Sequence, residues 1–182
     1  RALEKAKLLA NKAGSLVTAK ETSDAIKVAD VIIPAIHFNS LKEFFQTYAI
    51  ELEGKIIVDV SNPIAPDGNG GFKKIVGEYE SAGQILSNLI PKSAKLIKAF
   101  GTLGAVSLVG AAFNSPERKV LFYASDSTNS NQQIEEVISN SGFEPYHVGG
   151  IDQSIRIEVF GDLHEFGRLG KTVTIEEVKK IL

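Results

Sequence analysis

Two stretches of the chain, residues 28–35 (VADVIIPA) and residues 55–63 (KIIVDVSNP), indicate the fold. Each contains a run of apolar residues and then reaches a turn with a proline. Continuous apolar runs of this length are typical of strands covered on both faces, as in parallel sheets. In an open α/β sheet, ligands bind in the crevice outside the carboxyl ends of the strands. The two strand ends therefore predict a cleft for a nucleotide cofactor.

The rest of the chain alternates predicted strands with helices of about ten residues. We expect further strands at residues 15–19, 56–60, 95–100, 119–124 and 143–148, beside the one at 30–35. We expect helices at residues 2–13, 22–28, 39–52, 81–89, 127–139, 151–169 and 173–182, and a loop at 61–72. This alternation predicts an α/β protein with a Rossmann-type doubly wound, mostly parallel sheet and C-terminal helices.

The length favours one domain with a small appendage, and the order of the predicted elements suggests a dinucleotide-binding domain at residues 1–150 and a C-terminal helical segment at 151–182. The 182 residues are 43% hydrophobic and 23% charged, which is typical of a globular protein with a real core. The net charge of −2 and the scattered basic residues argue against nucleic acid as a partner. We see no signal peptide and no apolar run long enough to cross a membrane, and expect a cytoplasmic protein. With no Cys, disulfides and thiolate chemistry are excluded.

The helical start of the chain is unusual for this fold. A dinucleotide-binding unit begins with a strand, a glycine-rich turn, a helix and a second strand. The sequence begins at Arg1 within a helical pattern and contains no Met. We therefore expect about 30 residues, one strand–helix–strand unit, before Arg1. Methionines replaced by a non-standard residue would be a second explanation for their absence.

Five motifs together carry a family resemblance: ADVIIPAIHF, GKIIVDVSNP, KLIKAFGTLGA, FYASD and GFEPYHVGG. In this order and spacing, the chain resembles the deazaflavin-dependent NADP oxidoreductase family. The resemblance covers nearly the whole chain. It implies NADP as the cofactor and a GxGxxG motif before Arg1.

The resemblance implies that Arg1 and Lys5 face the 2′-phosphate of the cofactor. Residues four apart share one face of a helix, and Arg can pair bidentately with phosphate. A solvated helix end stays open as an alternative, because Lys7 and Lys12 are basic as well.

The resemblance also places Ile33, Pro34 and His37 against the ribose and the nicotinamide. Pro34 removes a backbone donor and stops the strand, and His37 follows the strand end. For His37, the alternative is a solvent-bonded residue at the start of a helix.

Polar and small residues follow the next two strands. Ser61 and Asn62 are able to meet the carboxamide or the substrate, although Asn-Pro is also a common turn. Ala99, Gly101 and Thr102 are small enough for a flat ring to approach the backbone. Deazaflavin-using family members carry a His immediately before the Thr, where this chain has Gly101. The acceptor is therefore open between a flavin and a deazaflavin.

Other chemistry finds little support, and we assign no catalytic residue. A metal site at His147 or His164 lacks a second ligand cluster, and residues two apart do not share a helix face. No GxSxG motif supports a catalytic triad.

These observations predict an NADP-dependent oxidoreductase that transfers a hydride between NADPH and a flavin-like or deazaflavin-like acceptor. A non-catalytic NADP-binding sensor or regulatory domain is the alternative, and an inert fragment is a third possibility. A bulky side chain over Gly101–Gly104 would favour the sensor. We also expect a homodimer, because apolar residues surround much of the helix expected at 151–169. These residues are Ile155, Ile157, Val159, Phe160, Leu163 and Phe166.

Overall fold

The computed structural model describes residues 3–182 and contains a five-stranded sheet as its centre. The strands follow the order β1-β2-β5-β6-β7. Their bounds are β1 (Val31–Ile32), β2 (Ile56–Asp59), β5 (Lys95–Lys98), β6 (Val120–Ser125) and β7 (Glu144–His147). β1, β2 and β5 are parallel, β6 runs antiparallel to β5, and β7 is parallel to β6. The predicted mostly parallel α/β sheet is confirmed.

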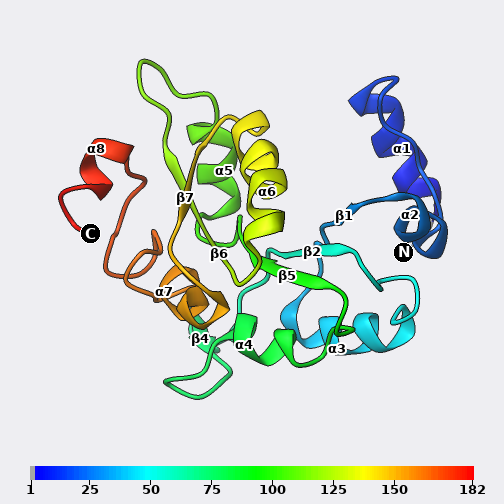
Figure 1. The fold of residues 1–182 in the computed structure, drawn as a ribbon. Coiled ribbons are helices and arrows are strands. Elements are labelled where there is room, and N and C mark those ends of the chain that lie inside the picture. Colours follow the sequence, from blue (N-terminus) through cyan, green and yellow to red (C-terminus); the bar gives the residue numbers. More distant parts are fainter. Residues whose placement is uncertain (1–2) are drawn as a thin grey trace.

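Helices cover both faces of this sheet, as a doubly wound fold requires (Figure 1). One face carries α3 (Phe38–Thr47) and α4 (Ala82–Ser87), with α2 (Thr22–Val28) towards its edge. The other face carries α5 (Ala105–Ala111) and α6 (Thr128–Asn140). Each face has its own apolar core. The strands supply Ile57 and Leu96 to the first core and Ile56, Val58, Ile97 and Leu121 to the second.

The C-terminal segment differs from the single helix expected at residues 151–169. It forms the 3₁₀ turn η1 (Ile151–Gln153) and the short helix α7 (Ser154–Ile157), and α8 (Ile175–Val178) follows later. The helix ends because Glu158 is extended, with φ −81° and ψ 163°. Ile157 and Leu163 are buried against β6 in a third apolar cluster. Part of the apolar surface that suggested a dimer is therefore covered by the chain's own sheet.

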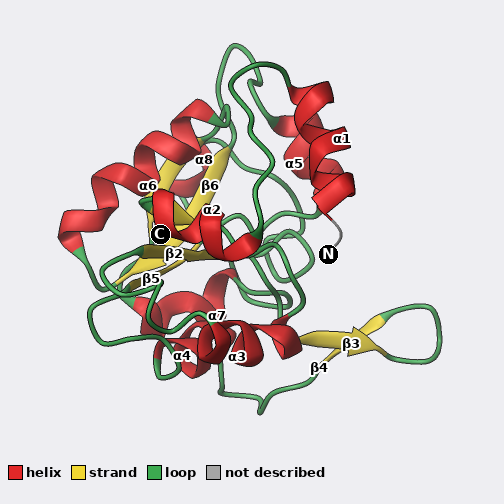
Figure 2. Cartoon of the chain, turned by 90° about the vertical axis from the view of Figure 1, so that its right-hand side faces the viewer, coloured by secondary structure: helices red, strands yellow, loops and turns green. Residues whose placement is uncertain are grey.

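A small hairpin occupies the segment expected to be a loop at residues 61–72. Its strands are β3 (Ile64–Pro66) and β4 (Phe72–Lys74), which pair antiparallel and project from the body (Figure 2). The Asp67 Oδ1 atom accepts hydrogen bonds from the backbone N–H groups of Asn69 and Gly71. The expectation of a structureless loop is wrong, because this carboxylate closes a turn that lets both arms pair.

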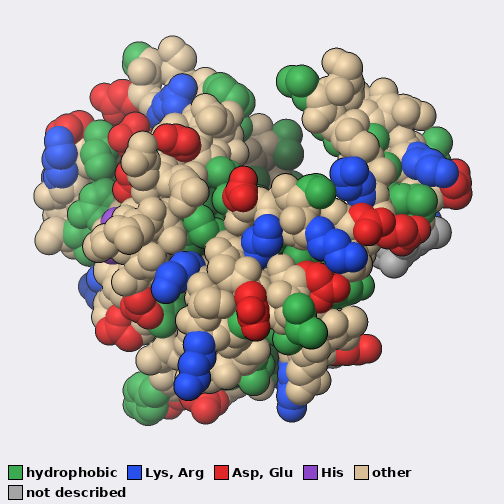
Figure 3. All heavy atoms as spheres, turned by 45° about the vertical axis from the view of Figure 1, so that its right-hand side comes forward, with side chains coloured by type: hydrophobic (Ala, Val, Ile, Leu, Met, Phe, Trp, Pro, Cys, Tyr) green, Lys and Arg blue, Asp and Glu red, His purple; other side chains and the backbone are tan. Residues whose placement is uncertain are grey.

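In the N-terminal region, one predicted element is confirmed and one prediction is wrong. The predicted helix is α1 (Leu3–Ala13), followed by Gly14 with φ +99°. Residues 15–19 form no strand, and Leu16 is 98% exposed. Among the described residues no strand lies beside this segment, so its backbone groups find no ladder partner. A notch separates the lobe that carries α1 from the rest of the molecule (Figure 3).

A candidate cofactor cleft at the strand ends

The carboxyl ends of β1 and β2 enclose a cavity of about 570 Å³. It is lined by residues from two short segments: Ala35, Ile36, His37, Phe38 and Asn39, and Val60, Ser61, Asn62, Ile64, Ala65 and Pro66. The structure thus brings His37, Ser61 and Asn62 together. A larger cavity, of about 790 Å³, lies at the amino-terminal ends of β2 and β5. We place the site in the smaller one, because ligands of this fold bind at carboxyl strand ends.

The first rim of the cleft follows β1. Pro34 is buried beneath it, whereas Ile33 is 45% exposed and lies outside the cavity lining. His37 is exposed and precedes α3 as its N-cap residue, with its carbonyl accepting from the Ser40 N–H at 2.9 Å. Its imidazole makes no hydrogen bond to any residue between 3 and 182. This ring is therefore available to a ligand at the mouth of the cleft.

The second rim follows β2 and is buried. Ser61 is 6% exposed, and its Oγ atom has no hydrogen-bond partner within the described chain. Buried polar atoms are nearly always paired, so an orphan hydroxyl beside a cavity points to a ligand. Asn62 is already paired: its Nδ2 donates to the Gly101 carbonyl at 2.9 Å, and its Oδ1 accepts from the Val159 N–H at 2.8 Å. The nitrogen and the oxygen of the Asn62 amide are thus both hydrogen-bonded, which fixes the turn.

The small residues after β5 are covered by the chain itself. Ala99 is 1% and Thr102 is 2% exposed, and neither lines the cavity. The Thr102 Oγ1 atom lies 3.5 Å from the Phe122 carbonyl. A Cβ on Gly101 would lie 2.9 Å from the Val60 carbonyl oxygen. Close backbone packing thus favours glycine at position 101, whatever the acceptor is.

The segment after Glu158 lies over these small residues. The Nδ1 atom of buried His164 accepts from the Phe166 N–H at 2.9 Å, and its Nε2 donates to the Gly101 carbonyl at 2.9 Å. Burial lowers the pKa of His164 below its ordinary value, which favours this neutral form. The Glu165 carboxylate accepts from the Gly104 N–H, and the Phe166 ring packs against Gly104. This buried histidine was considered only as a metal ligand from the sequence.

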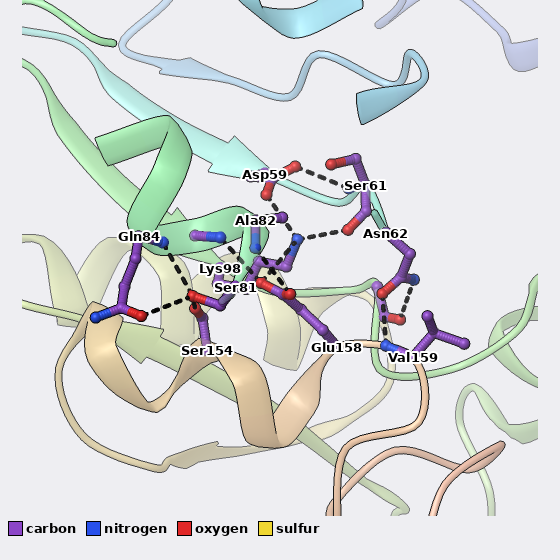
Figure 4. A network of polar contacts seen from close by, with 12 residues as sticks. Asp59, Ser61, Asn62, Ser81, Ala82, Gln84, Lys98, Ser154, Glu158 and Val159 are labelled. Atoms are coloured by element: carbon purple, nitrogen blue, oxygen red, sulfur yellow. Dashed lines mark hydrogen bonds and ion pairs between the residues drawn. The ribbon is translucent and has the colours of Figure 1, made fainter. Parts of the chain in front are cut away.

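A buried charge cluster lies directly beneath the second rim (Figure 4). Lys98, Asp59 and Glu158 are each at most 1% exposed. The Lys98 Nζ atom lies 2.6 Å from Asp59 Oδ2 and 3.8 Å from Glu158 Oε1. The sequence analysis missed this cluster. A signal was present, because Lys98 interrupts an apolar strand in which every neighbour is expected to be buried.

Comparisons with known proteins bear on this architecture. Residues 1–63 match the family described as NADP oxidoreductase, coenzyme F420-dependent. The family resemblance is confirmed over these residues, which make up about a third of the chain. Coenzyme F420 is a deazaflavin, so this is the family to which the sequence motifs pointed.

Two individual proteins are also similar to this chain, one in sequence and one in sequence and structure. Metalloreductase STEAP3 of Rattus norvegicus is 28% identical over 147 residues, which cover 79% of this chain. This chain spans about a quarter, 27%, of that protein. The crystal structure of a hypothetical protein from Sinorhizobium meliloti superimposes with a TM-score of 0.79 and 27% identity, covering 96% of this chain and 80% of the other.

A more distant structure shows the fold alone. It is a proposed F420-dependent NADP-reductase from an Arthrobacter species, with a TM-score of 0.63 and 19% identity. The likeness covers 72% of this chain and 60% of that one. The Rossmann-type assignment rests on this agreement together with the observed strand order.

The two basic residues predicted from the F420-dependent family lie outside the cleft or outside the described chain. Arg1 falls outside the described residues. Lys5 is exposed on α1 and lines a different cavity, of about 600 Å³, with Lys20 and Glu21. The role of this pair at the 2′-phosphate stays a prediction.

Two further properties concern residues 3–182. Within them, no helix has the length and apolar character needed to span a membrane. The same residues contain no group of three or more His, Asp or Glu side chains arranged to hold a metal ion. His147 instead stacks on Tyr123, with ring centres 4.9 Å apart.

Proposed function

We propose that this chain forms the dinucleotide-binding part of an NADP-dependent oxidoreductase, which transfers a hydride between NADPH and a flavin-type or deazaflavin-type acceptor. The observation that carries the proposal is the cavity between His37 and the orphan Ser61 hydroxyl at the ends of two parallel strands. The match of residues 1–63 to an NADP oxidoreductase family supports the cofactor and the reaction class. The strand-end site and the chemistry of the matched family thus support the same function.

The residues of the cleft fit a nicotinamide. The Ser61 hydroxyl can donate to or accept from the carboxamide, and its burial makes that hydrogen bond selective. The exposed His37 ring can cover the ribose or nicotinamide from the opposite rim. NADPH supplies the hydride when bound. The protein's task is then to hold the ring and exclude water, which needs positioning more than acid–base groups.

The acceptor is the less constrained half of the proposal. The family name points to a deazaflavin, whereas Gly101 replaces the His of deazaflavin-using members. Without that side chain the protein lacks one donor to the acceptor ring. We therefore expect a flavin or a similar small acceptor to be reduced at least as well as the deazaflavin coenzyme.

A non-catalytic NADP-binding sensor is the second candidate, and one observation favours it. Segment 164–166 covers Gly101 and Gly104, so the small-residue surface is not open to a second ring in this conformation. Phe166 is 63% exposed, and its ring lies against that of buried His164, with ring centres 5.5 Å apart. We keep the oxidoreductase as the main proposal because the family is one of oxidoreductases.

We also propose that the protein works as a homodimer. Helix α5 has no buried residue, and Val106 and Val109 on it are 88% and 83% exposed. Phe166 packs at the start of this helix and is exposed too. Such a cluster is typical of an interaction surface. A monomeric mass in light scattering at micromolar concentration would contradict the dimer.

The proposed cofactor is tested by calorimetric titration of the full-length protein with NADPH and NADH. We expect tighter binding of NADPH. We also expect Arg1→Ala to cost about 1.5–3 kcal/mol of NADPH binding, as for a charged hydrogen-bond partner. Lys5→Ala should weaken NADPH in the same direction. Equal affinity for the two nucleotides, or no effect of Arg1→Ala, would contradict the proposal.

The reaction is tested by steady-state oxidation of NADPH with a flavin and with the deazaflavin coenzyme as acceptors. Reduction of the flavin at least as fast as the deazaflavin supports the proposed acceptor range. A strong preference for the deazaflavin would show that Gly101 has no influence. Tight NADPH binding without turnover of any acceptor would favour the sensor.

A further inference from the structure

The buried lysine beneath the cleft has an unusual environment. Lys98 is 1% exposed, and its ammonium group contacts three oxygen atoms from separate residues. Burying a lysine and two carboxylates costs solvation, and well-packed apolar residues often replace such clusters without loss of stability. Stability alone therefore gives a weak reason for charges at this position. Their place against the second rim suggests a role in the cleft.

We infer that Lys98 is a positioning residue of the cofactor cleft, which holds the Ser61 backbone so that the Ser61 hydroxyl faces the bound nicotinamide. This inference rests on the proposed function. It adds a residue on β5 that does not itself line the cavity. Lys98 acts through Ser61.

Both backbone polar groups of Ser61 are held by one ion pair. The Lys98 Nζ atom donates to the Ser61 carbonyl at 2.5 Å and to Asp59 Oδ2 at 2.6 Å. The other carboxylate oxygen, Asp59 Oδ1, accepts from the Ser61 N–H at 2.8 Å. The peptide planes on both sides of Ser61 are therefore fixed. The Ser61 side chain is the one polar group of this residue left without a partner in the described chain.

The second carboxylate joins the rim to two distant segments (Figure 4). The Glu158 carboxylate accepts from the Ala82 and Gly83 N–H groups at the start of α4, each at 2.9 Å. The next residue, Val159, donates its N–H to Asn62 Oδ1 at 2.8 Å. Ser61 and Asn62 are thus held by contiguous parts of the same cluster. This leaves the backbone of the turn little freedom to carry Ser61 away from the cavity.

The test compares two ligands that differ in the nicotinamide. NADPH carries it, whereas 2′-phospho-ADP-ribose lacks it and keeps the rest of the recognition elements. We expect Ser61→Ala and Lys98→Met each to weaken NADPH by about threefold to tenfold in calorimetry, the scale of one hydrogen bond. The affinity for 2′-phospho-ADP-ribose should stay unchanged. The double variant, Ser61→Ala with Lys98→Met, should bind NADPH no more weakly than the weaker-binding single variant, because both changes remove the same interaction.

A second variant covers the case in which Lys98→Met does not fold. Asp59→Asn combined with Lys98→Met removes the ion pair as a unit, while an amide oxygen at position 59 can still accept from the Ser61 N–H. It should show the same selective loss of NADPH affinity. Lys95→Met is the matched control, because Lys95 lies on the same strand and is exposed. It should bind both ligands as the wild type does.

Four results would overturn the inference, and the fourth would refute the proposed function as well. Equal loss of both ligands in the Lys98 variants would indicate a purely structural role. Additive losses in the double variant would show that Lys98 does not act through Ser61. Unchanged NADPH affinity in the Lys98 variants, with wild-type NADPH binding intact, would refute the inference and leave the proposed function standing. A wild-type protein that binds neither NADPH nor 2′-phospho-ADP-ribose would instead refute the proposed function, and this inference with it.

Discussion

The two rims of the cleft come from neighbouring strands and differ in how they are held. The rim after β1 carries His37, an exposed residue whose ring has no partner in the described chain. The rim after β2 carries Ser61, which is buried and fixed through its backbone by Asp59 and Lys98. Sequence patterns made these two strand ends look alike. The structure shows that one is exposed and adaptable and the other is rigid.

This difference suggests a division of labour in ligand binding. A rigid rim keeps its hydrogen-bonding group in place before the ligand arrives, so less conformational entropy is lost on binding. An exposed rim can adjust its side chain to the bound molecule. We therefore expect changes at the rigid rim to affect both stability and ligand selectivity. Changes at the exposed rim should leave stability nearly unaltered.

The largest effect should come from removing the cation of the buried charge cluster while its carboxylates remain. Lys98→Met leaves the buried carboxylates of Asp59 and Glu158 without their cation, and we expect it to lower the free energy of unfolding by about 3–5 kcal/mol. His37→Ala at the exposed rim should change it by less than about 0.5 kcal/mol. Urea denaturation of both variants measures this contrast. Similar stabilities would show that the two rims are held alike.

A medium effect is expected from the close packing behind the rigid rim. In Gly101→Ala the new Cβ would lie 2.9 Å from the Val60 carbonyl oxygen and 3.3 Å from that of Ser61, so the backbone must shift. Overpacking of this kind costs about 1–3 kcal/mol. Gly110→Ala is the matched control, because no atom lies within 4 Å of its Cβ position and a helical Ala is favoured by about 0.5–1 kcal/mol. A fully stable Gly101→Ala protein would contradict the packing argument.

The smallest effect is a dependence of stability on pH. It tests how the segment around His164 packs behind the rigid rim. Burial lowers the pKa of His164 below its ordinary value of 6.5, so below that pH the unfolded chain takes up a proton before the native protein does. The free energy of unfolding should fall as the pH drops from 6.5 towards the native pKa. The slope for one group is at most about 1.4 kcal/mol per pH unit.

His164→Gln provides the comparison for that measurement. The glutamine amide can still donate to the Gly101 carbonyl, but it does not titrate in this range. Urea denaturation between pH 7.5 and pH 5 should show a flatter dependence in the variant. Parallel curves for the wild type and the variant would mean that another group causes the dependence.

Local sequence patterns predicted the elements whose signals are themselves local. The apolar runs that became β2 and β6 are continuous, and Ser81 begins α4 as an N-cap whose Oγ accepts from the Gln84 N–H. The errors arose where non-local contacts decide. Residues 15–19 have strand-like residues but no neighbouring strand in the described chain. The helix expected at 151–169 ends before Glu158, whose carboxylate binds the start of α4.

The site shows the same limit. Placing Ser61 and His37 at strand ends needed only the rule for parallel sheets. Ser61 keeps an unpaired hydroxyl, whereas the Asn62 amide is paired with Val159 and Gly101, which are far away in the sequence. The structural reason for Gly101 also depends on β2 and is invisible in its own motif. Sequence reasoning placed His37 and Ser61 at two strand ends that line one cavity and missed the contacts that shape it.

The contact between Glu158 and the start of α4 also affects the order in which the protein folds. Glu158 is 76 residues from Ala82, and Val159 is 97 residues from Asn62. Contacts that close such long loops lose much chain entropy and form slowly. During synthesis, the turn at Ser61 leaves the ribosome well before the residues that secure it. The cleft therefore acquires its final shape as a late event, when nearly all of the described chain has been made.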